Sequence, residues 1–186
     1  MAVAASSKLV LGTPAPAFIL PDTVSGKILS LESLQSDMAN VIMFLCNHCP
    51  YVKHVNPEIV RIVNKYQPKG ISFIGISSND ALQYPEDGPE EMKKTAEKLG
   101  YNFPYLYDES QDVARAYDAA CTPDLYVFNS ALALIYHGQL DDSRAAGTLP
   151  LNGKDLRDVL ECVLAGYPLP EFQRPSIGCS IKWKKE

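Results

Sequence analysis

The 186-residue chain lacks features that mark several classes of protein. Its net charge is −5 and its isoelectric point about 5.2, so there is no excess of positive charge to bind nucleic acid. No stretch approaches the roughly 18 consecutive apolar residues of a membrane span. The opening MAVAASSKLVLG does not resemble a secretory signal peptide. We therefore expect a cytoplasmic protein that binds neither nucleic acid nor membrane.

The chain also lacks a disulfide framework, because it has five cysteines, an odd number. In the reducing cytoplasm, disulfides are usually transient and catalytic. A zinc motif is missing as well. Cys46, His48, Cys49 and His54 offer ligand atoms, but no second C-x-x-C or H-x-x-x-H pair is present to complete a tetrahedral site. We predict neither a metal site nor an organic cofactor.

The first half of the chain alternates between strand-like and helical patterns. The segment GTPAPAFILPDTVSGKILSLESLQ predicts a hairpin around Ser25-Gly26 and a short helix. Continuous apolar runs predict buried strands at residues 40–45 and 71–78. Between them, helical spacing of apolar residues predicts a helix from about Cys49 to just before Pro68, with a kink at Pro57.

The second half continues the alternation. The expected elements are a helix capped by Asp87 and closed by Gly100, a strand in PYLYD, a helix from Ser110 to Tyr117, a hairpin around Asn129-Ser130, and a helix capped by Asn152 and ended by Gly166. This order predicts an α/β fold whose central sheet is parallel in its first part and flanked by helices.

No repeat or low-complexity linker divides the chain, so we expect one domain over residues 1–186 with its core at about 12–166. An inserted strand–helix unit is expected near residues 104–119. The C-terminal strap (residues 167–186) is rich in proline and has no periodicity. We expect it to be irregular and to lie on the surface.

The segment FLCNHCPYVKHV places Cys46 and Cys49 where a buried strand gives way to a helix. Functional sites of α/β sheets gather beyond the carboxyl ends of strands. The N-terminus of a helix favours a thiolate over a thiol. A C-x-x-C pair in this setting indicates thioredoxin-like redox chemistry, and a pair of inert buried cysteines is the alternative.

Within the pair, we expect Cys46 to be the exposed attacking thiolate and Cys49, in the first helical turn, to be the resolving thiol. His48 lies between them. If protonated, its positive charge stabilises the thiolate and makes the pair more oxidising; alternatively, it faces solvent with little influence.

Other residues near the pair have two interpretations each. Cys121 either relays electrons or packs as a small apolar residue, and Cys179 either reaches the pair from the strap or lies on a mobile tail. Asn79-Asp80 follow the second buried strand, at the same sheet edge as the cysteines. Asp80 either orders water or substrate there or caps the next turn.

The motifs CNHCP, after a buried strand, and CTPDLYVF, before a hairpin, resemble the thioredoxin fold. The resemblance implies that Pro123 is a cis-proline facing the C-x-x-C pair. There it removes an N–H group and holds an extended edge against which a substrate backbone or disulfide can pair. We count Asn47, His48, Pro50 and Thr122 as supporting residues of this site.

The opening GTPAPAFILPDTVSGK is similar to the start of the peroxiredoxin-like branch, which includes alkyl hydroperoxide reductases, and the resemblance extends over residues 12–166. Peroxiredoxins resemble P-x-x-x-T/S-x-x-C. With Cys49 on the attacking cysteine, Ile42 replaces the proline and Cys46 the hydroxyl residue. The arginine expected before the late hairpin is missing, and Pro123 and Asp124 stand there. These departures weaken the case for peroxidase chemistry.

A further departure concerns Asn40, which stands where thioredoxins place a buried acid, so the general base is unidentified. Taken together, the sequence predicts a thioredoxin-like thiol–disulfide oxidoreductase with an N-terminal hairpin and a C-terminal strap. Its expected partners are a protein or small-molecule disulfide and an electron-donating dithiol protein. The alternatives are a peroxiredoxin-like thiol peroxidase and a redox-responsive binding protein without turnover.

Overall fold

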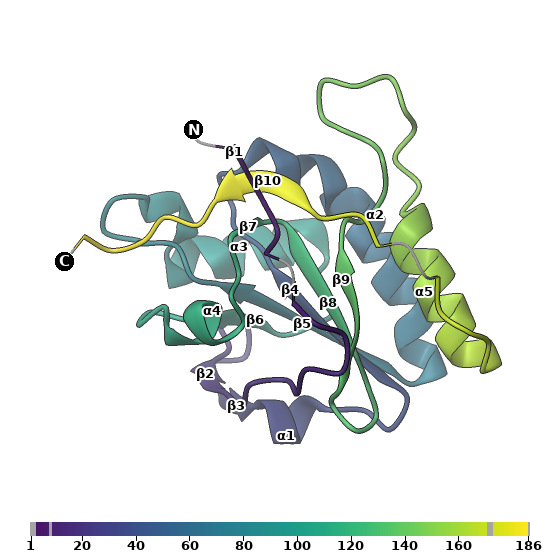
Figure 1. Ribbon diagram of the computed structural model, residues 1–186. Helices are drawn as coiled ribbons and strands as arrows, with labels where there is room; N and C mark the ends of the chain where they lie inside the picture. The colour runs from purple at the N-terminus through teal and green to yellow at the C-terminus, as the bar shows by residue number, and fades with distance from the viewer. Residues whose placement is uncertain (1–2, 8, 171–172, 186) are drawn as a thin grey trace.

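The computed structural model describes residues 3–7, 9–170 and 173–185. Its centre is a five-stranded sheet with the order β6-β5-β4-β8-β9 (Figure 1). The strands are β4 (Ala39–Phe44), β5 (Ile71–Ser77), β6 (Tyr105–Tyr107), β8 (Asp124–Asn129) and β9 (Leu134–Gly138). β4, β5 and β6 are mutually parallel, whereas β8 and β9 are antiparallel to their neighbours. The predicted mixed sheet, parallel in its first part, is confirmed.

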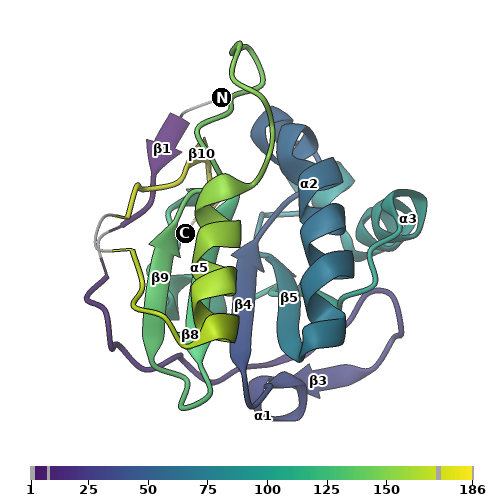
Figure 2. The same ribbon diagram turned by 90° about the vertical axis from the view of Figure 1, so that its right-hand side faces the viewer.

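Helices cover both faces of this sheet. Figure 2 shows α2 (Pro50–Tyr66) and α5 (Lys154–Ala165) side by side on one face. The side chains of β4 alternate between the two faces, as in any strand. Val41 and Met43 join the core cluster that contains residues of α2, α5 and α3 (Pro89–Leu99). Ile42 and Phe44 join a second cluster with α4 (Asp112–Ala116).

The N-terminal hairpin is present as predicted. It consists of β2 (Ile19–Pro21) and β3 (Ile28–Ser30), followed directly by α1 (Leu31–Leu34). Gly26 in its turn has a φ of 72°, which glycine adopts without steric cost. Two short 3₁₀ helices complete the helical elements of the described chain: η1 (Gln67–Lys69) and η2 (Pro85–Asp87). None of the described helices combines the length and apolar character that a membrane span requires.

Several predicted helix boundaries are wrong in detail. The N-cap of α3 is Gly88 rather than Asp87, because the Asp87 carboxylate is engaged elsewhere by backbone N–H groups. The N-cap of α5 is Gly153 rather than Asn152, whose side chain accepts a hydrogen bond from the Lys154 N–H. α4 begins at Asp112 rather than at Ser110. Pro57 lies inside α2, which continues to Tyr66.

The prediction of an irregular C-terminal strap is wrong for its central part. Ile177–Ser180 form β10, which pairs antiparallel with β1 (Val3–Ala5) on one side and with β7 (Cys121–Thr122) on the other. This second sheet lies above the upper end of the central sheet in Figure 1. Cys179 and Ile181 of the strap are buried, but burial does not alternate along β10, because Gly178 is buried next to Cys179. The short segment therefore has no strand periodicity by which the sequence could predict it. Positions 171, 172 and 186 of the strap lie outside the described residues.

The core makes a first prediction about stability. Leu125 in β8 is 0% exposed and Leu82 is 90% exposed. Leu125→Ala leaves a cavity in the central sheet and should lower the free energy of unfolding by about 2–5 kcal/mol. Leu82→Ala makes the same chemical change at the surface and should alter it by less than about 0.5 kcal/mol. Denaturant unfolding of the two variants measures the difference, and equal losses would contradict the described core.

Candidate active site

The two predicted cysteines lie in the turn that joins β4 to α2. β4 ends at Phe44, and Cys49 is the N-cap residue of α2, with Pro50 in the first helical position. Pro50 suits this position because the first N–H of a helix has no partner within the helix. The strand and helix therefore place both sulfurs beyond the carboxyl end of a central strand, as the sequence predicts.

The turn faces the segment before β8. The Thr122–Pro123 peptide bond is cis, which confirms the expectation for Pro123. The Cys46 sulfur lies 3.2 Å from the Thr122 hydroxyl oxygen, and the Cys49 sulfur lies 3.4 Å from the Thr122 carbonyl oxygen. The structure thus brings together Cys46, Cys49, Thr122 and Pro123, which are far apart in the sequence.

A third cysteine joins the pair. β10 places Cys179 opposite Thr122 in the strand register, and its sulfur lies 2.7 Å from that of Cys49. Of the two interpretations of Cys179, the structure supports the one in which the strap reaches the pair. Cys121 differs: its sulfur donates to the Pro123 carbonyl oxygen at 3.7 Å, and burial raises its pKa above the usual range. Its packing fits a small apolar residue.

Both sulfurs of the pair are covered. Cys46 is 2% exposed and Cys49 is 0% exposed, so the expectation of an exposed Cys46 is wrong. The residues that cover them include the strap, because β10 lies directly against β7. A substrate larger than a small molecule therefore requires some movement of the covering segments to reach either sulfur.

The electrostatics of the pair favour the thiolate on Cys49 rather than on Cys46. The pKa of Cys49 falls to about 5 because the Cys46 thiol donates a hydrogen bond to it, and this outweighs the effect of burial. The Cys179 thiol and the backbone N–H groups of Val52 and Cys179 add further donors. The pKa of Cys46 rises well above its usual value because its proton is held by Cys49, and burial and the Asp87 charge act in the same direction.

The position of each cysteine relative to the start of α2 explains why the pKa of Cys49 is lowered and that of Cys46 is raised. Free N–H groups and the positive end of the helix dipole stabilise an anion at the N-cap. That residue is Cys49, and Cys46 lies three positions before it. As a thiol, Cys49 can donate to the Thr122 carbonyl oxygen; as a thiolate it loses this contact but gains several donors. These contacts favour the negative charge on Cys49 and keep the proton on Cys46.

Asp87 holds the cysteine turn in place, a role that the sequence pattern did not reveal. Its side chain is fully buried. One carboxylate oxygen accepts hydrogen bonds from the backbone N–H groups of Asn47, at 2.7 Å, and His48, at 3.2 Å. The other lies 2.5 Å from His48 Nδ1 and accepts from the Asn79 side chain at 2.8 Å. The sequence pattern indicated only a helix cap at this position.

His48 is directed toward this carboxylate. Its ring stacks on Tyr84 with 5.0 Å between centroids, and its Nε2 atom is buried without a hydrogen-bond partner among the described residues. When protonated, His48 forms an ion pair with Asp87. That neighbouring negative charge offsets the influence that we expected His48 to have on the thiolate.

The other supporting residues fix the same turn. The Asn47 side chain donates to the Glu86 carbonyl oxygen at 2.7 Å and accepts from the Tyr105 hydroxyl at 3.3 Å. Asp80 caps a turn, because its carboxylate accepts from the Leu82 N–H, in agreement with the second of its two interpretations. Asn40 is buried and bonds to Ser36 and Asn129.

The side chains around the turn fit a metal ion poorly. Cys46, His48 and Asp87 each offer one ligand atom, and these atoms lie within 4.8 Å of one another. The Asp87 carboxylate, however, already makes four hydrogen-bonding contacts, which a metal ion would have to displace. His54, another suggested ligand, contacts the Ser143 hydroxyl instead, at 2.9 Å.

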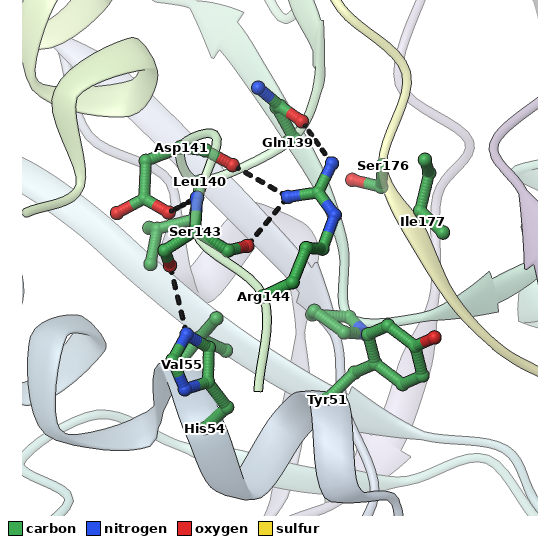
Figure 3. Close-up of a pocket in the computed structure, with 11 residues that line it drawn as sticks. Tyr51, His54, Val55, Gln139, Leu140, Asp141, Ser143, Arg144, Ser176 and Ile177 are labelled. Atoms are coloured by element: carbon green, nitrogen blue, oxygen red, sulfur yellow. Dashed lines mark hydrogen bonds between the residues drawn. The ribbon is translucent and has the colours of Figure 1, made fainter. Parts of the chain in front are cut away.

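A small hollow with a volume of about 20 Å³ lies beside Pro123 (Figure 3). Helix α2 contributes Tyr51 and His54, and the strap contributes Ser176 and Ile177. The Arg144 guanidinium lines the hollow and donates to the carbonyl oxygens of Asp141 and Ser143 and to the side chain of Gln139, as Figure 3 shows. The hollow therefore adjoins the cis-proline edge and is lined by a basic and an acidic residue, Arg144 and Asp141.

Comparisons with known proteins agree with this geometry. The family model described as AhpC/TSA matches residues 11–137. The chain belongs to the AhpC/TSA family. No curated protein gives a significant match to the chain.

Two solved structures are similar over nearly the whole chain. An uncharacterized conserved protein from Geobacillus kaustophilus is 57% identical, with a TM-score of 0.98 over 100% of this chain and 98% of the other. A hypothetical protein from Sinorhizobium meliloti is 38% identical, with a TM-score of 0.95 over 98% and 99% of the two chains.

A more distant match shows the fold alone. The thioredoxin domain of a thiol-disulfide oxidoreductase from Bacteroides vulgatus is 20% identical, with a TM-score of 0.60 over 70% of this chain and 89% of that domain. This AhpC/TSA protein therefore has the predicted thioredoxin-like fold, a central mixed sheet flanked by helices.

The site predicts a titration with a clear sign. Reduced protein should show a thiolate signal with a midpoint near pH 5, because the pKa of Cys49 is lowered to about 5. Cys49→Ser should abolish it, and Cys46→Ala should raise the midpoint because a donor to the thiolate is lost. Cys162→Ser, on the far helix α5, is the control. Ultraviolet thiolate absorbance measures each curve.

The same ionisation links stability to pH. Folding lowers the pKa of Cys49 from 9.0 to about 5, so its contribution is complete above about pH 9 and is lost as the pH falls through about 5. The stability difference between reduced wild type and Cys49→Ser should therefore grow with pH across this window. A difference that does not change with pH would contradict the assignment.

Asp87 allows a separate test of the turn. Asp87→Asn keeps an acceptor for the backbone N–H groups but removes the charge that helps to raise the pKa of Cys46. The thiolate step of Cys46 should move to lower pH. Asp112→Asn, an exposed change on α4, is the control. An unchanged Cys46 titration in Asp87→Asn would show that the carboxylate does not influence the sulfur.

Proposed function

We propose that this protein is a thiol–disulfide oxidoreductase that acts through Cys46 and Cys49. The observation that carries the proposal is the arrangement of the two sulfurs. They lie at the N-terminus of α2, each within hydrogen-bonding distance of Thr122 beside its cis bond to Pro123, and the pKa of one of them, Cys49, is lowered to about 5. Dithiol–disulfide exchange requires a thiolate that attacks the substrate and a second thiol nearby that resolves the mixed disulfide.

The reaction follows from the charges. The Cys49 thiolate attacks one sulfur of a substrate disulfide and forms a mixed disulfide, and the other substrate sulfur leaves with the electron pair. Cys46 then loses its proton and attacks the Cys49 sulfur. The Cys46–Cys49 disulfide forms, and the reduced substrate departs with two electrons; one of its two protons comes from Cys46 and the other from solvent. The geometry thus favours Cys49 rather than Cys46 as the attacking sulfur.

The substrate we propose is a protein or small-molecule disulfide, and a dithiol protein would return the enzyme to its reduced form. Edges of β-sheet bind extended peptides through backbone hydrogen bonds. The Thr122–Pro123 edge and the adjoining hollow offer such a surface next to the sulfurs. We expect the protein to act in the reducing cytoplasm, where a dithiol donor keeps the pair reduced.

A thiol peroxidase is the second candidate, favoured by the AhpC/TSA family match and by the burial of both sulfurs, which only a small oxidant such as a hydroperoxide reaches without movement. The contacts of Cys49 weigh against it. Its donors are thiols and backbone N–H groups, with no guanidinium to polarise a peroxide bond. A redox-responsive binding protein would keep the disulfide but show no turnover.

Trapping experiments test which sulfur attacks. In a Cys179→Ser background, Cys46→Ser should retain substrates as mixed disulfides on Cys49, because the resolving thiol is absent. Cys49→Ser should retain few. Mass spectrometry of proteins captured from cell extract identifies the bonded cysteine. Stable mixed disulfides on Cys46 alone would overturn the assignment of Cys49 and restore Cys46 as the attacking sulfur.

Turnover tests the reaction itself. Wild type and Cys162→Ser should reduce insulin disulfides with dithiothreitol as donor, and Cys46→Ser and Cys49→Ser should each be slower by about a hundredfold or more. Hydrogen peroxide consumption with the same donor separates the second candidate. Rapid peroxide consumption without insulin reduction would replace the proposed function by the peroxidase.

A further inference from the structure

The edge on which we place the substrate is already occupied by the chain itself. β10 pairs with β7, and its residues Cys179 and Ser180 lie opposite Thr122 and Cys121. Two glycines allow this close approach. A Cβ atom on Gly178 would lie 2.0 Å from the Thr122 carbonyl oxygen, and one on Gly138 would lie 2.4 Å from the Arg174 carbonyl oxygen of the strap. A side chain at either glycine would therefore prevent the strap from packing this closely against its neighbours.

In this packed position, the Cys179 sulfur lies where a sulfur of a substrate disulfide would have to lie to react with Cys49. Its side chain is 2% exposed and its sulfur lies 2.7 Å from that of Cys49. Cys46, three residues before Cys49 in the same turn, contacts Thr122 as Cys49 does. Cys49 therefore has one candidate disulfide partner in its own turn and another on the strap.

We propose that Cys179 is a third redox thiol, which converts the Cys46–Cys49 disulfide into a Cys49–Cys179 disulfide that holds the strap across the Thr122–Pro123 edge. This inference rests on the proposed function, because exchange at Cys49 supplies the disulfide. It also implies that activity is regulated. The oxidised protein interconverts between an open form with the Cys46–Cys49 disulfide and a closed form in which the Cys49–Cys179 disulfide holds the C-terminal strand over the edge.

The exchange is balanced within the chain. The Cys179 sulfur, after losing its proton, attacks the Cys49 sulfur of the Cys46–Cys49 disulfide. The Cys49–Cys179 bond forms and the Cys46–Cys49 bond breaks. The electron pair goes to the Cys46 sulfur, which takes up a proton. The number of disulfides is unchanged, so the step needs no external oxidant or reductant.

The charges fit the direction of this exchange. In the reduced protein, burial raises the pKa of Cys179 to about 12, and the hydrogen bond and charge of Cys49 add to the rise. Once Cys49 is in a disulfide, it no longer carries a charge or the hydrogen bond that raises the pKa of Cys179. The neighbouring Lys182 still favours the Cys179 anion. Cys179 is therefore a better nucleophile toward the oxidised pair than its reduced-state pKa implies.

The strap is also connected to the cysteine turn through Asn79. The side-chain oxygen of Asn79 accepts the Lys182 N–H at 2.8 Å, and its side-chain nitrogen donates to Asp87 at 2.8 Å. Asp87 in turn holds the N–H groups of Asn47 and His48. Residues of the strap, Ser176 and Ile177, also form one wall of the hollow in Figure 3. Movement of the strap thus changes both the turn and the adjoining surface.

Disulfide mapping tests the chemistry directly. Wild type is equilibrated in a glutathione redox buffer, alkylated at low pH, digested and analysed by mass spectrometry. We expect both Cys46–Cys49 and Cys49–Cys179 linkages, and Cys49–Cys179 alone after diamide oxidation of Cys46→Ser. Cys162→Ser, the matched control, should give the wild-type pattern. Absence of any Cys49–Cys179 linkage in both wild type and Cys46→Ser would overturn the proposal.

Turnover tests the closure. Gly178→Ala should displace β10 and raise the rate of insulin reduction by about tenfold, since more of the protein is open to substrate. It should also lower the fraction with the Cys49–Cys179 linkage. Cys179→Ser retains β10 and Gly178 but lacks the thiol. Its oxidised form therefore has no Cys49–Cys179 disulfide to hold the strap over the edge. Unchanged rates in both variants would contradict the closure.

The two proposals fail in different ways. If Cys179→Ser forms the Cys46–Cys49 disulfide and reduces insulin at the wild-type rate, only the inference about Cys179 fails. If neither wild type nor Cys179→Ser forms that disulfide or reduces insulin, while circular dichroism shows both folded, the proposed oxidoreductase function fails.

Discussion

Cys49 occupies the N-cap of α2, where the positive end of the helix dipole favours a negative charge, and the chemistry of the site depends on that charge. A buried anion is unfavourable unless several donors surround it. Here the helix supplies a backbone N–H, Cys46 supplies a thiol, and β10 supplies the thiol and the N–H of Cys179. The charge therefore depends on three segments that the fold brings together.

Because one of these segments is the strap, access to substrate and acidity of the nucleophile are coupled. With the strap in place, Cys49 has its full set of donors but is covered. When the strap leaves, Cys49 becomes accessible and loses two donors, which raises its pKa, although less burial acts in the opposite direction. In such a site the Cys49 thiolate is covered while β10 is paired with β7, and it becomes accessible to substrate when β10 is displaced. The connection from Lys182 through Asn79 to Asp87 gives that displacement a route to the cysteine turn.

Local patterns predicted much of the fold. The apolar runs that became β4 and β5 are buried on both faces, and helical spacing placed α2 to within a residue or two. The cis bond at Thr122-Pro123 was expected from the resemblance to the thioredoxin fold rather than from a local pattern. The apolar runs, the helical spacing and the turn residues that located both hairpins are local signals. Each of these signals lies within a short window of sequence, where propensity and periodicity act.

The features that were missed depend on contacts between distant residues. β10 exists because it pairs with β1, at the other end of the chain, and with the two residues of β7. Asp87 has the composition of a helix cap, but folding directs it to N–H groups 39 and 40 residues away. The opposite pKa directions of Cys46 and Cys49 could not be read from the sequence, because they depend on which groups surround each sulfur after folding, among them Cys179 from β10.

The most direct test of the central claim, that reduced Cys49 is an anion at neutral pH, is the pH dependence of the reduction potential of the Cys46–Cys49 disulfide in Cys179→Ser. If only Cys46 takes up a proton on reduction, the potential falls by about 30 mV per pH unit between about pH 6 and pH 8. If both sulfurs are protonated on reduction, it falls by about 59 mV per pH unit over the same range, and that steeper slope would contradict the assignment of the charge to Cys49.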